Sequence, residues 1–229
     1  MMTRAVMASA VISVILQTAA AAHERFKPPG DLLPDSGKGV VTDTIFYPRM
    51  RFPIEQGPAY ASSHFYGVGG TRGPEGDSCD EVNYSYPWHD NFCEYRKSNL
   101  PLCPSGGHQG QDLRPATCRA NYYWAVAAED GVIAQIGRFG VTLQTPDGTL
   151  YRYDHLNTHD LAVHELDKVS RGDRIGKISN NWLDRLPIHL HFDAKDAVLF
   201  GDKTAVVFVP PYSSLVQSYV KLMDSASTK

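Results

Sequence analysis

Two closely spaced histidines give this sequence its first indication of a metal site. Residues 188–193 read IHLHFD and alternate as a β-strand does. A period of two places His189 and His191 on one face of the strand and the apolar residues on the other, where they would join a core. Two imidazoles side by side on a strand suit zinc or copper. Nine histidines in 229 residues give about 0.4 such pairs by chance, so this pair needs support from other residues.

A second group of possible ligands lies in residues 106–112, which read GGHQGQD. The glycines, with Pro115 nearby, favour a loop over a helix, and such a loop could turn His108 and Asp112 inward together. An imidazole nitrogen and a carboxylate oxygen are both good zinc donors. These two residues and one histidine of segment 188–193 would leave the fourth position of a tetrahedral zinc ion for water, as in catalytic zinc sites. That arrangement suits the hydrolysis of an amide or an ester.

The remaining histidines differ in what they could contribute. His155 ends a tyrosine-rich strand segment and could face the same groove, although a solvated histidine is the simpler interpretation of this residue alone. In the groove, His155 and the second histidine of the strand pair could move protons and stabilise a developing oxyanion. Five histidines have no partner at ligand spacing, and we assign them no role: His23, His64, His89, His159 and His164.

The segments that must position these residues have the pattern of a mostly β protein. Pro146-Asp147-Gly148 predicts a hairpin turn, and the apolar spacing of residues 212–223 predicts a helix packed on the sheet. Because strands and helices do not alternate, we expect an antiparallel β-sheet core with groove-forming loops. The predicted strands are residues 122–128, 132–136, 141–145, 150–155, 169–178 and 188–192.

Composition and the N-terminal segment limit the partners and the compartment. With 22 Lys and Arg against 25 Asp and Glu, the formal charge is -3. The sequence therefore lacks the excess of basic residues that binding to nucleic acid requires. Arg4, the apolar run 5–16 and the small residues 19–22 have the order of a secretory signal peptide. No other segment approaches about 18 apolar residues, so we expect no stable membrane insertion after cleavage. The sequence thus predicts an exported protein, periplasmic or secreted.

Four cysteines agree with export. An even number of cysteines in an exported chain, without a C-x-x-C pair, predicts two disulfides with three possible pairings. Because it closes two short local loops, we favour Cys79–Cys93 with Cys103–Cys118 over the other two pairings. The second of these bridges would stiffen the loop that holds His108.

The order of the motifs along the chain resembles that of the lysostaphin-type (LytM-like) zinc metallopeptidases, which cut peptidoglycan cross-bridges. Residues 107–113 (GHQGQDL) look like the family's H-x-G-x-D motif, and residues 125–133 (AVAAEDGVI) look like its V-x-A-A-x-D-G-V-V strand pair. Residues 147–156 look like its D-G…Y-x-H-L hairpin, and residues 169–179 (VSRGDRIGKIS) look like its G-D-x-I-G turn. The similarity covers roughly residues 52–194.

The resemblance implies a role for each matched residue. His108, Asp112 and His191 match the family's three zinc ligands, so one zinc ion per chain is expected. His155 and His189 match the two histidines that flank the metal-activated water and polarise or protonate the scissile amide. The resemblance therefore implies an exported zinc endopeptidase that hydrolyses peptide cross-links of bacterial peptidoglycan.

Two alternatives stay open at this point. A LytM-like module without catalysis could bind the cell wall or activate another hydrolase, although such modules usually lack a zinc ligand and all five positions are filled here. An exported metal-binding protein of unrelated fold would require the motif order to be coincidental. In a periplasm the expected target is the D-Ala–diaminopimelate bond, but residues 180–187 replace the family's Gly/Ser/Thr-rich loop, so glycine bridges and foreign cell walls stay open as well.

These observations predict four segments along the chain. The longest is the LytM-like domain, and its insertion carries three of the four cysteines. The predicted segments are a signal peptide over 1–22, an N-terminal arm over 23–51, the LytM-like domain over 52–200 with an insertion at about 62–105, and a C-terminal extension over 201–229 that contains the helix.

Overall fold

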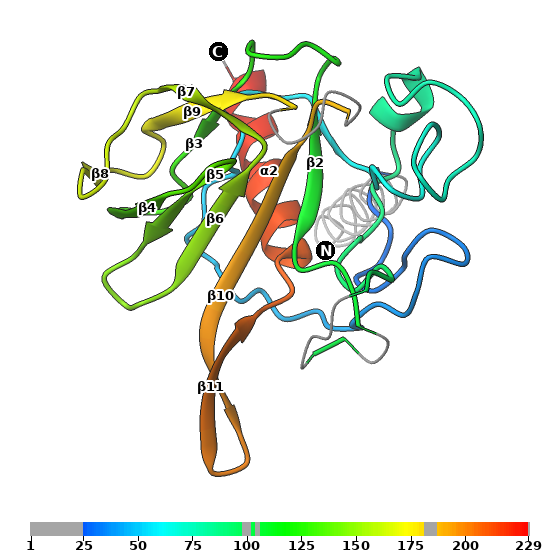
Figure 1. Ribbon diagram of the computed structural model, residues 1–229. Coiled ribbons are helices and arrows are strands. Elements are labelled where there is room, and N and C mark those ends of the chain that lie inside the picture. The colour runs from blue at the N-terminus through cyan, green and yellow to red at the C-terminus, as the bar shows by residue number, and fades with distance from the viewer. Residues whose placement is uncertain (1–24, 98–101, 104–105, 181–186, 229) are drawn as a thin grey trace, which may run out of the picture.

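The computed structural model describes residues 25–97, 102–103, 106–180 and 187–228 (Figure 1). The predicted signal peptide and most of the loop 180–187 lie outside these residues. The described residues form a mostly antiparallel β structure with a helix near the C-terminus, which confirms the predicted fold class. None of the described helices is both long enough and apolar enough to cross a membrane.

The strands follow most of the predicted segments with shifted ends. β1, β2, β7 and β11 were not predicted, because their sequences lack a clear apolar alternation. In chain order the elements are β1 (Ala59–Ala61), the 3-10 helix η1 (Glu81–Tyr84), β2 (Gln111–Pro115), β3 (Trp124–Val126), β4 (Gly131–Ile136), β5 (Gly140–Gln144), β6 (Leu150–Asp154), β7 (Leu156–Leu161), β8 (Lys168–Val169), β9 (Arg174–Ile178), β10 (Leu190–Phe200), β11 (Lys203–Phe208) and α2 (Tyr212–Ser227).

Two antiparallel sheets make up the described part of the chain. The larger has the strand order β1-β2-β10-β6-β5-β4-β8, with β11 paired to β10, and the smaller has the order β3-β9-β7. The central strand β10 therefore lies between β2 and β6, which come from distant parts of the sequence. In Figure 1, α2 passes behind β10, and the β10–β11 hairpin extends below the sheet.

The core lies between the large sheet and α2. Leu190 and Phe192 of β10 are fully buried on this side, as the strand alternation predicts. Tyr219 of α2 packs against Trp88, with ring centroids 4.5 Å apart, and its hydroxyl accepts a hydrogen bond from the Ala59 backbone of β1 (3.1 Å). The helix thus packs on the sheet, as predicted. Phe26 of the N-terminal arm belongs to the same core, so residues of the predicted arm, LytM-like domain and C-terminal extension are packed together; the segment boundaries themselves stay predictions.

The disulfide pairing differs from the prediction. The structure has Cys79–Cys118 and Cys93–Cys103, with Cα–Cα distances of 5.6 and 5.2 Å, so the predicted pairs Cys79–Cys93 and Cys103–Cys118 are wrong. The reason is tertiary. Arg114 on β2 donates a hydrogen bond to the carbonyl of Ser78 (2.9 Å), and this contact holds the Cys79 segment beside the end of β2. A preference for short local loops contains no information about that contact.

Candidate metal centre

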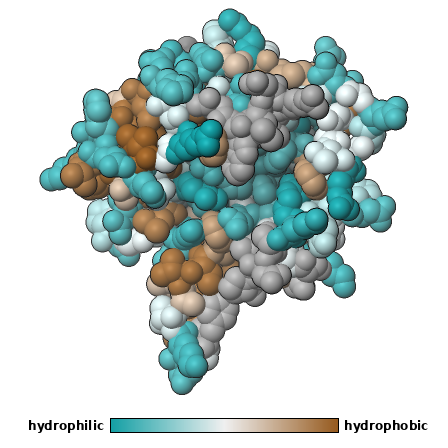
Figure 2. Space-filling view, viewed as in Figure 1, coloured by the Kyte–Doolittle hydropathy of each residue, from teal (hydrophilic) through white to brown (hydrophobic). Residues whose placement is uncertain are grey.

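Strand pairing brings the first two candidate ligands together. In the antiparallel register of β2 and β10, Asp112 lies directly opposite His191, and the neighbouring pair Leu113 and Leu190 points into the core. Directly opposed residues share a sheet face, so Asp112 and His191 both point away from α2. Asp112 therefore lies on a strand and not in the predicted loop, because β10 supplies its pairing partner. Over these strands, Figure 2 shows a hollow lined by hydrophilic residues.

His108 reaches the same place from the loop before β2. Its backbone N–H donates to the Glu94 carbonyl (2.8 Å), and its carbonyl accepts from the Cys93 N–H (2.9 Å). Gly107 permits this close pairing, because a Cβ at that position would lie 2.7 Å from the Cys93 carbonyl carbon. Lack of space for a side chain thus explains the glycine at position 107. The backbone pairing fixes the direction of the His108 side chain.

The three candidate ligands form a compact triangle of donor atoms. His108 Nε2 lies 3.1 Å from Asp112 Oδ1 and 2.9 Å from His191 Nδ1, and His191 Nδ1 lies 3.3 Å from the same Asp112 oxygen. Zinc with bonds of about 2.0–2.1 Å holds tetrahedral ligands roughly 3.4 Å apart. All three residues are at most 8% exposed. The spacing therefore fits a single small cation after shifts of a few tenths of an ångström.

Further hydrogen bonds orient both imidazoles. His108 Nδ1 lies 2.8 Å from the Asn91 carbonyl oxygen, so Nδ1 carries the hydrogen and Nε2 is left as the lone-pair donor. His191 Nε2 lies 3.2 Å from Asp193 Oδ2, which is also held by Arg152 (2.7 Å), and Nδ1 is left toward the triangle. Such contacts hold metal-binding histidines in one tautomer and one ring orientation. Asn91 also accepts the Asp112 backbone N–H through its side chain (3.0 Å), so it contacts two of the candidate ligands.

The two remaining predicted site residues lie beside the triangle. His189 precedes β10 and its Nδ1 hydrogen-bonds the Pro187 carbonyl (2.8 Å), which leaves Nε2 directed at the site, 3.7 Å from Asp112 Oδ1. This Nε2 has no hydrogen-bond partner among the described residues. The ring of His155 is centred 4.5 Å from that of His189. His155 joins β6 to β7 with a φ of 68°, a left-handed conformation that a non-glycine residue adopts at a cost of about 1–3 kcal/mol.

Burial and neighbouring charges set the protonation of these five side chains. Burial lowers the pKa of His108 to about 4 and, with His191 nearby, that of His155 to about 3; it also lowers the pKa of His189 well below its usual value. Burial alone would raise the pKa of Asp112, but the adjacent histidines hold it well below its usual value. Burial opposes a charge on His191, yet hydrogen bonds to two carboxylates raise its pKa to about 9. A metal ion bound to His191 would have to displace that proton.

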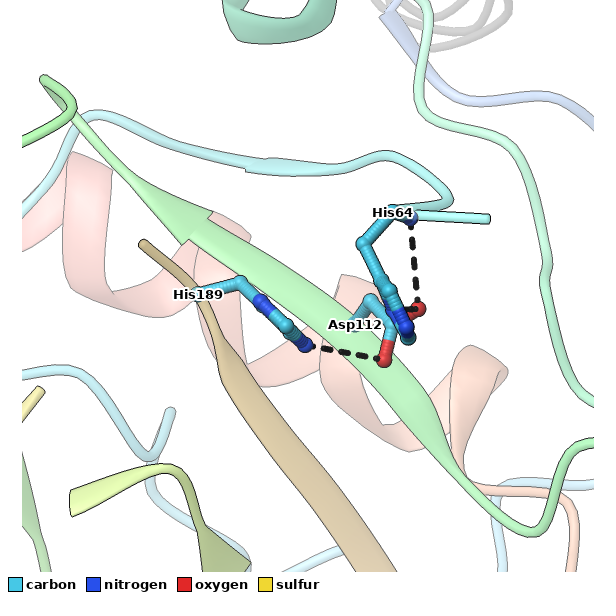
Figure 3. Close-up of side chains that lie close together, drawn as sticks. All are labelled: His64, Asp112 and His189. Carbon is cyan, nitrogen blue, oxygen red and sulfur yellow. Dashed lines mark hydrogen bonds and ion pairs between the residues drawn. The ribbon is translucent and has the colours of Figure 1, made fainter. Parts of the chain in front are cut away.

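His64 also lies in the site, and sequence analysis missed it. Its Nδ1 lies 2.6 Å from Asp112 Oδ2, and its ring stacks on His189 with centroids 4.5 Å apart (Figure 3). It belongs to the insertion, 44 positions before the nearest ligand in sequence (108 − 64). No spacing signal could link them, and the pairing of β1 with β2 brings this segment to Asp112. His159 and His164 lie on the surface, away from the five site residues.

The Cys93–Cys103 bridge gives a prediction about this centre. The double substitution Cys93→Ser and Cys103→Ser should weaken zinc binding roughly tenfold, because Cys93 pairs with the backbone of His108 and a loosened support typically costs about 10–100-fold in metal affinity. Zinc dissociation constants measured by competition with a chromophoric chelator test this.

The second bridge supplies the matched control. Removing Cys79–Cys118 should also lower the free energy of unfolding by about 2–4 kcal/mol, yet leave the zinc dissociation constant within about threefold, because neither cysteine contacts the centre. An equal loss of zinc affinity in both double variants would show that general destabilisation, and not support of His108, is responsible.

A buried His-Asp-His donor set beside two further histidines, on an antiparallel sheet, suits a metal-dependent hydrolase. The comparison with protein families agrees, because residues 106–203 match the model of peptidase family M23. The match to the M23 model over this part of the chain confirms the predicted resemblance to lysostaphin-type peptidases.

Solved structures similar to this chain include peptidases of that type. A candidate glycyl-glycine endopeptidase LytM from Ruminococcus gnavus is 20% identical, with a TM-score of 0.46 over 76% of this chain and 62% of that chain. The catalytic domain of lysostaphin from Staphylococcus simulans is 23% identical, with a TM-score of 0.35 over 49% of this chain and 85% of that one. The M23 metalloprotease pseudoalterin, from the deep sea, is 18% identical, with a TM-score of 0.37 over 68% and 73%. No curated protein sequence matches the chain.

Proposed function

We propose that the protein is an exported zinc endopeptidase that hydrolyses peptide cross-links of bacterial peptidoglycan. The observation that carries this proposal is the buried triangle of His108, Asp112 and His191 donor atoms, 2.9–3.3 Å apart, with His155 and His189 beside it. The M23 match over residues 106–203 supports the peptidase class. Two disulfides support an oxidising compartment and therefore export.

The donor set suits zinc. Two imidazole nitrogens and one carboxylate oxygen are its usual ligands at catalytic sites, and three protein ligands leave one position for water or substrate. When bound, zinc supplies a Lewis acid and allows water to ionise near neutral pH. The backbone carbonyl of Asn91 and the carboxylate of Asp193 support this role, because they hold His108 and His191 in the tautomers that expose a lone pair.

The two other histidines would transfer the proton and stabilise the developing negative charge. His189 donates its Nδ1 hydrogen to Pro187, so its Nε2 lone pair can accept a proton from the attacking water. We assign His155 to the scissile carbonyl oxygen, where a hydrogen bond would stabilise the developing negative charge. The proton taken up at His189 Nε2 would then pass to the leaving amine. Both rings are neutral near pH 7, as these roles require at the start of the reaction.

Digestion of purified peptidoglycan tests the function. We expect new peptide ends by mass spectrometry, absent from digests with His191→Ala and from digests with a chelator, and the ends will name the bond that is cut. If the protein binds one zinc ion per chain and yields no new ends, the enzymatic proposal fails in favour of a LytM-like module that acts through another hydrolase.

A further inference from the structure

The insertion before β2 reaches into the candidate centre through His64. This residue contacts the ligand Asp112 with its ring and its backbone, and it stacks on the proposed proton acceptor His189. On the basis of the proposed function, we propose that His64 is a positioning residue that holds Asp112 as a one-oxygen ligand and holds the ring plane of His189. The insertion would then be a functional part of the active centre.

The contact with Asp112 has the geometry of a hydrogen bond and not of a second metal site. His64 Nδ1 and Asp112 Oδ2 are 2.6 Å apart, whereas two ligands on one tetrahedral zinc ion lie roughly 3.4 Å apart. His64, Asp112 and His189 do bring three donor atoms within 4.8 Å of one another, but the rings of His64 and His189 stack nearly parallel, at 21°, which keeps their in-plane lone pairs in separate, almost parallel planes. Because a carboxylate only accepts hydrogen bonds, His64 Nδ1 is the donor.

Because of this hydrogen bond, the two oxygens of the Asp112 carboxylate have different partners. Oδ2 accepts from the His64 ring at 2.6 Å and from the His64 backbone N–H at 3.4 Å. Oδ1 is left to face His108 and His191, at 3.1 and 3.3 Å. Rotation of the carboxylate toward bidentate binding would break both His64 contacts. His64 therefore selects which oxygen is presented to the metal.

His64 is itself held by a rigid turn. The Ser63 hydroxyl accepts the backbone N–H groups of Phe65 (3.1 Å) and Tyr66 (3.0 Å) and donates to Glu94 (2.7 Å). Glu94 is fully buried, and its backbone carbonyl pairs with the N–H of the ligand His108. The turn that carries His64 and the loop that carries His108 thus share one anchor. Only 16% of the His64 side chain is exposed, which fits a held group and not a solvated one.

Two substitutions separate the two contacts of His64. His64→Phe keeps an aromatic ring against His189 and removes the donor to Asp112, whereas His64→Asn keeps an N–H donor near the Nδ1 position and removes the ring. We would measure zinc stoichiometry, the zinc dissociation constant by chelator competition, and kcat and KM on a cross-linked peptide. His164→Phe is the matched control, because 91% of the His164 side chain is exposed.

We expect one zinc ion per chain in every variant. His64→Phe should bind zinc about 10–100-fold more weakly than the unmodified protein, the usual cost of losing a partner of a ligand. His64→Asn should bind zinc within about threefold of it but turn over more slowly, with KM little changed. Unchanged zinc affinity in His64→Phe would overturn the inference, as would two zinc ions in the unmodified protein and one in both variants. If the unmodified protein binds no zinc or cuts no peptide, the proposed function fails as well. If the unmodified protein is active and His64→Phe binds zinc equally tightly, only this inference fails.

Discussion

Asp112→Asn is expected to weaken zinc binding by more than about 100-fold and to abolish measurable peptide hydrolysis. The Asp112 carboxylate is fully buried and has three histidine nitrogens within 3.3 Å of its oxygens. The substitution removes the one negative charge of the proposed ligand set, so the loss should exceed the 10–100-fold that supporting residues cost. Metal content after dialysis and a chelator competition titration measure it.

Asp160→Asn is the matched control for this substitution. Asp160 lies on β7, 62% of its side chain is exposed, and its carboxylate pairs with Lys177 at 3.1 Å. Its loss should change zinc affinity by less than about threefold. Zinc binding by Asp112→Asn at the affinity of the unmodified protein would contradict the assignment of Asp112 as a ligand.

His189→Ala should lower kcat by roughly 10²–10⁴ while zinc stays bound, which is the usual contribution of a positioned general base. The physical reason is the orientation of its ring. The Pro187 carbonyl accepts a hydrogen bond from Nδ1, and Nε2 faces the donor triangle without belonging to it. Steady-state kinetics on a defined peptide, with metal content measured on the same sample, separate the two effects.

His159→Ala, at an exposed position on β7, controls for the loss of any histidine and should leave kcat unchanged. Loss of zinc from His189→Ala in parallel with activity would contradict the proton-transfer role and would make His189 a ligand.

Local sequence pattern and the order of the motifs predict five of the residues that gather at this centre, but not His64. The alternation around His189 and His191 predicts correctly that Leu190 and Phe192 enter the core. The glycine-rich approach to His108 predicts the loop, and the close packing of Gly107 on Cys93 explains it. These features depend on side-chain periodicity and steric space, which a short stretch of sequence contains.

The features that the sequence could not provide depend on contacts between distant segments. Asp112 lies on a strand because β10, near residue 191, pairs with it, and QDLRP has no alternation of its own. Cys79 pairs with Cys118 because the end of β2 lies against the insertion. His64 enters the centre through the pairing of β1 with β2, and no motif spacing indicates it. In each case the position of a residue is set by its strand partner.

Anomalous diffraction from crystals of the zinc-loaded protein, recorded on both sides of the zinc absorption edge, tests whether these three residues bind zinc. We expect one strong peak, about 2.0–2.2 Å from His108 Nε2, Asp112 Oδ1 and His191 Nδ1. A peak ligated by His64 or His189 in place of these atoms, or the absence of zinc from this group in a protein that hydrolyses peptidoglycan, would contradict this expectation.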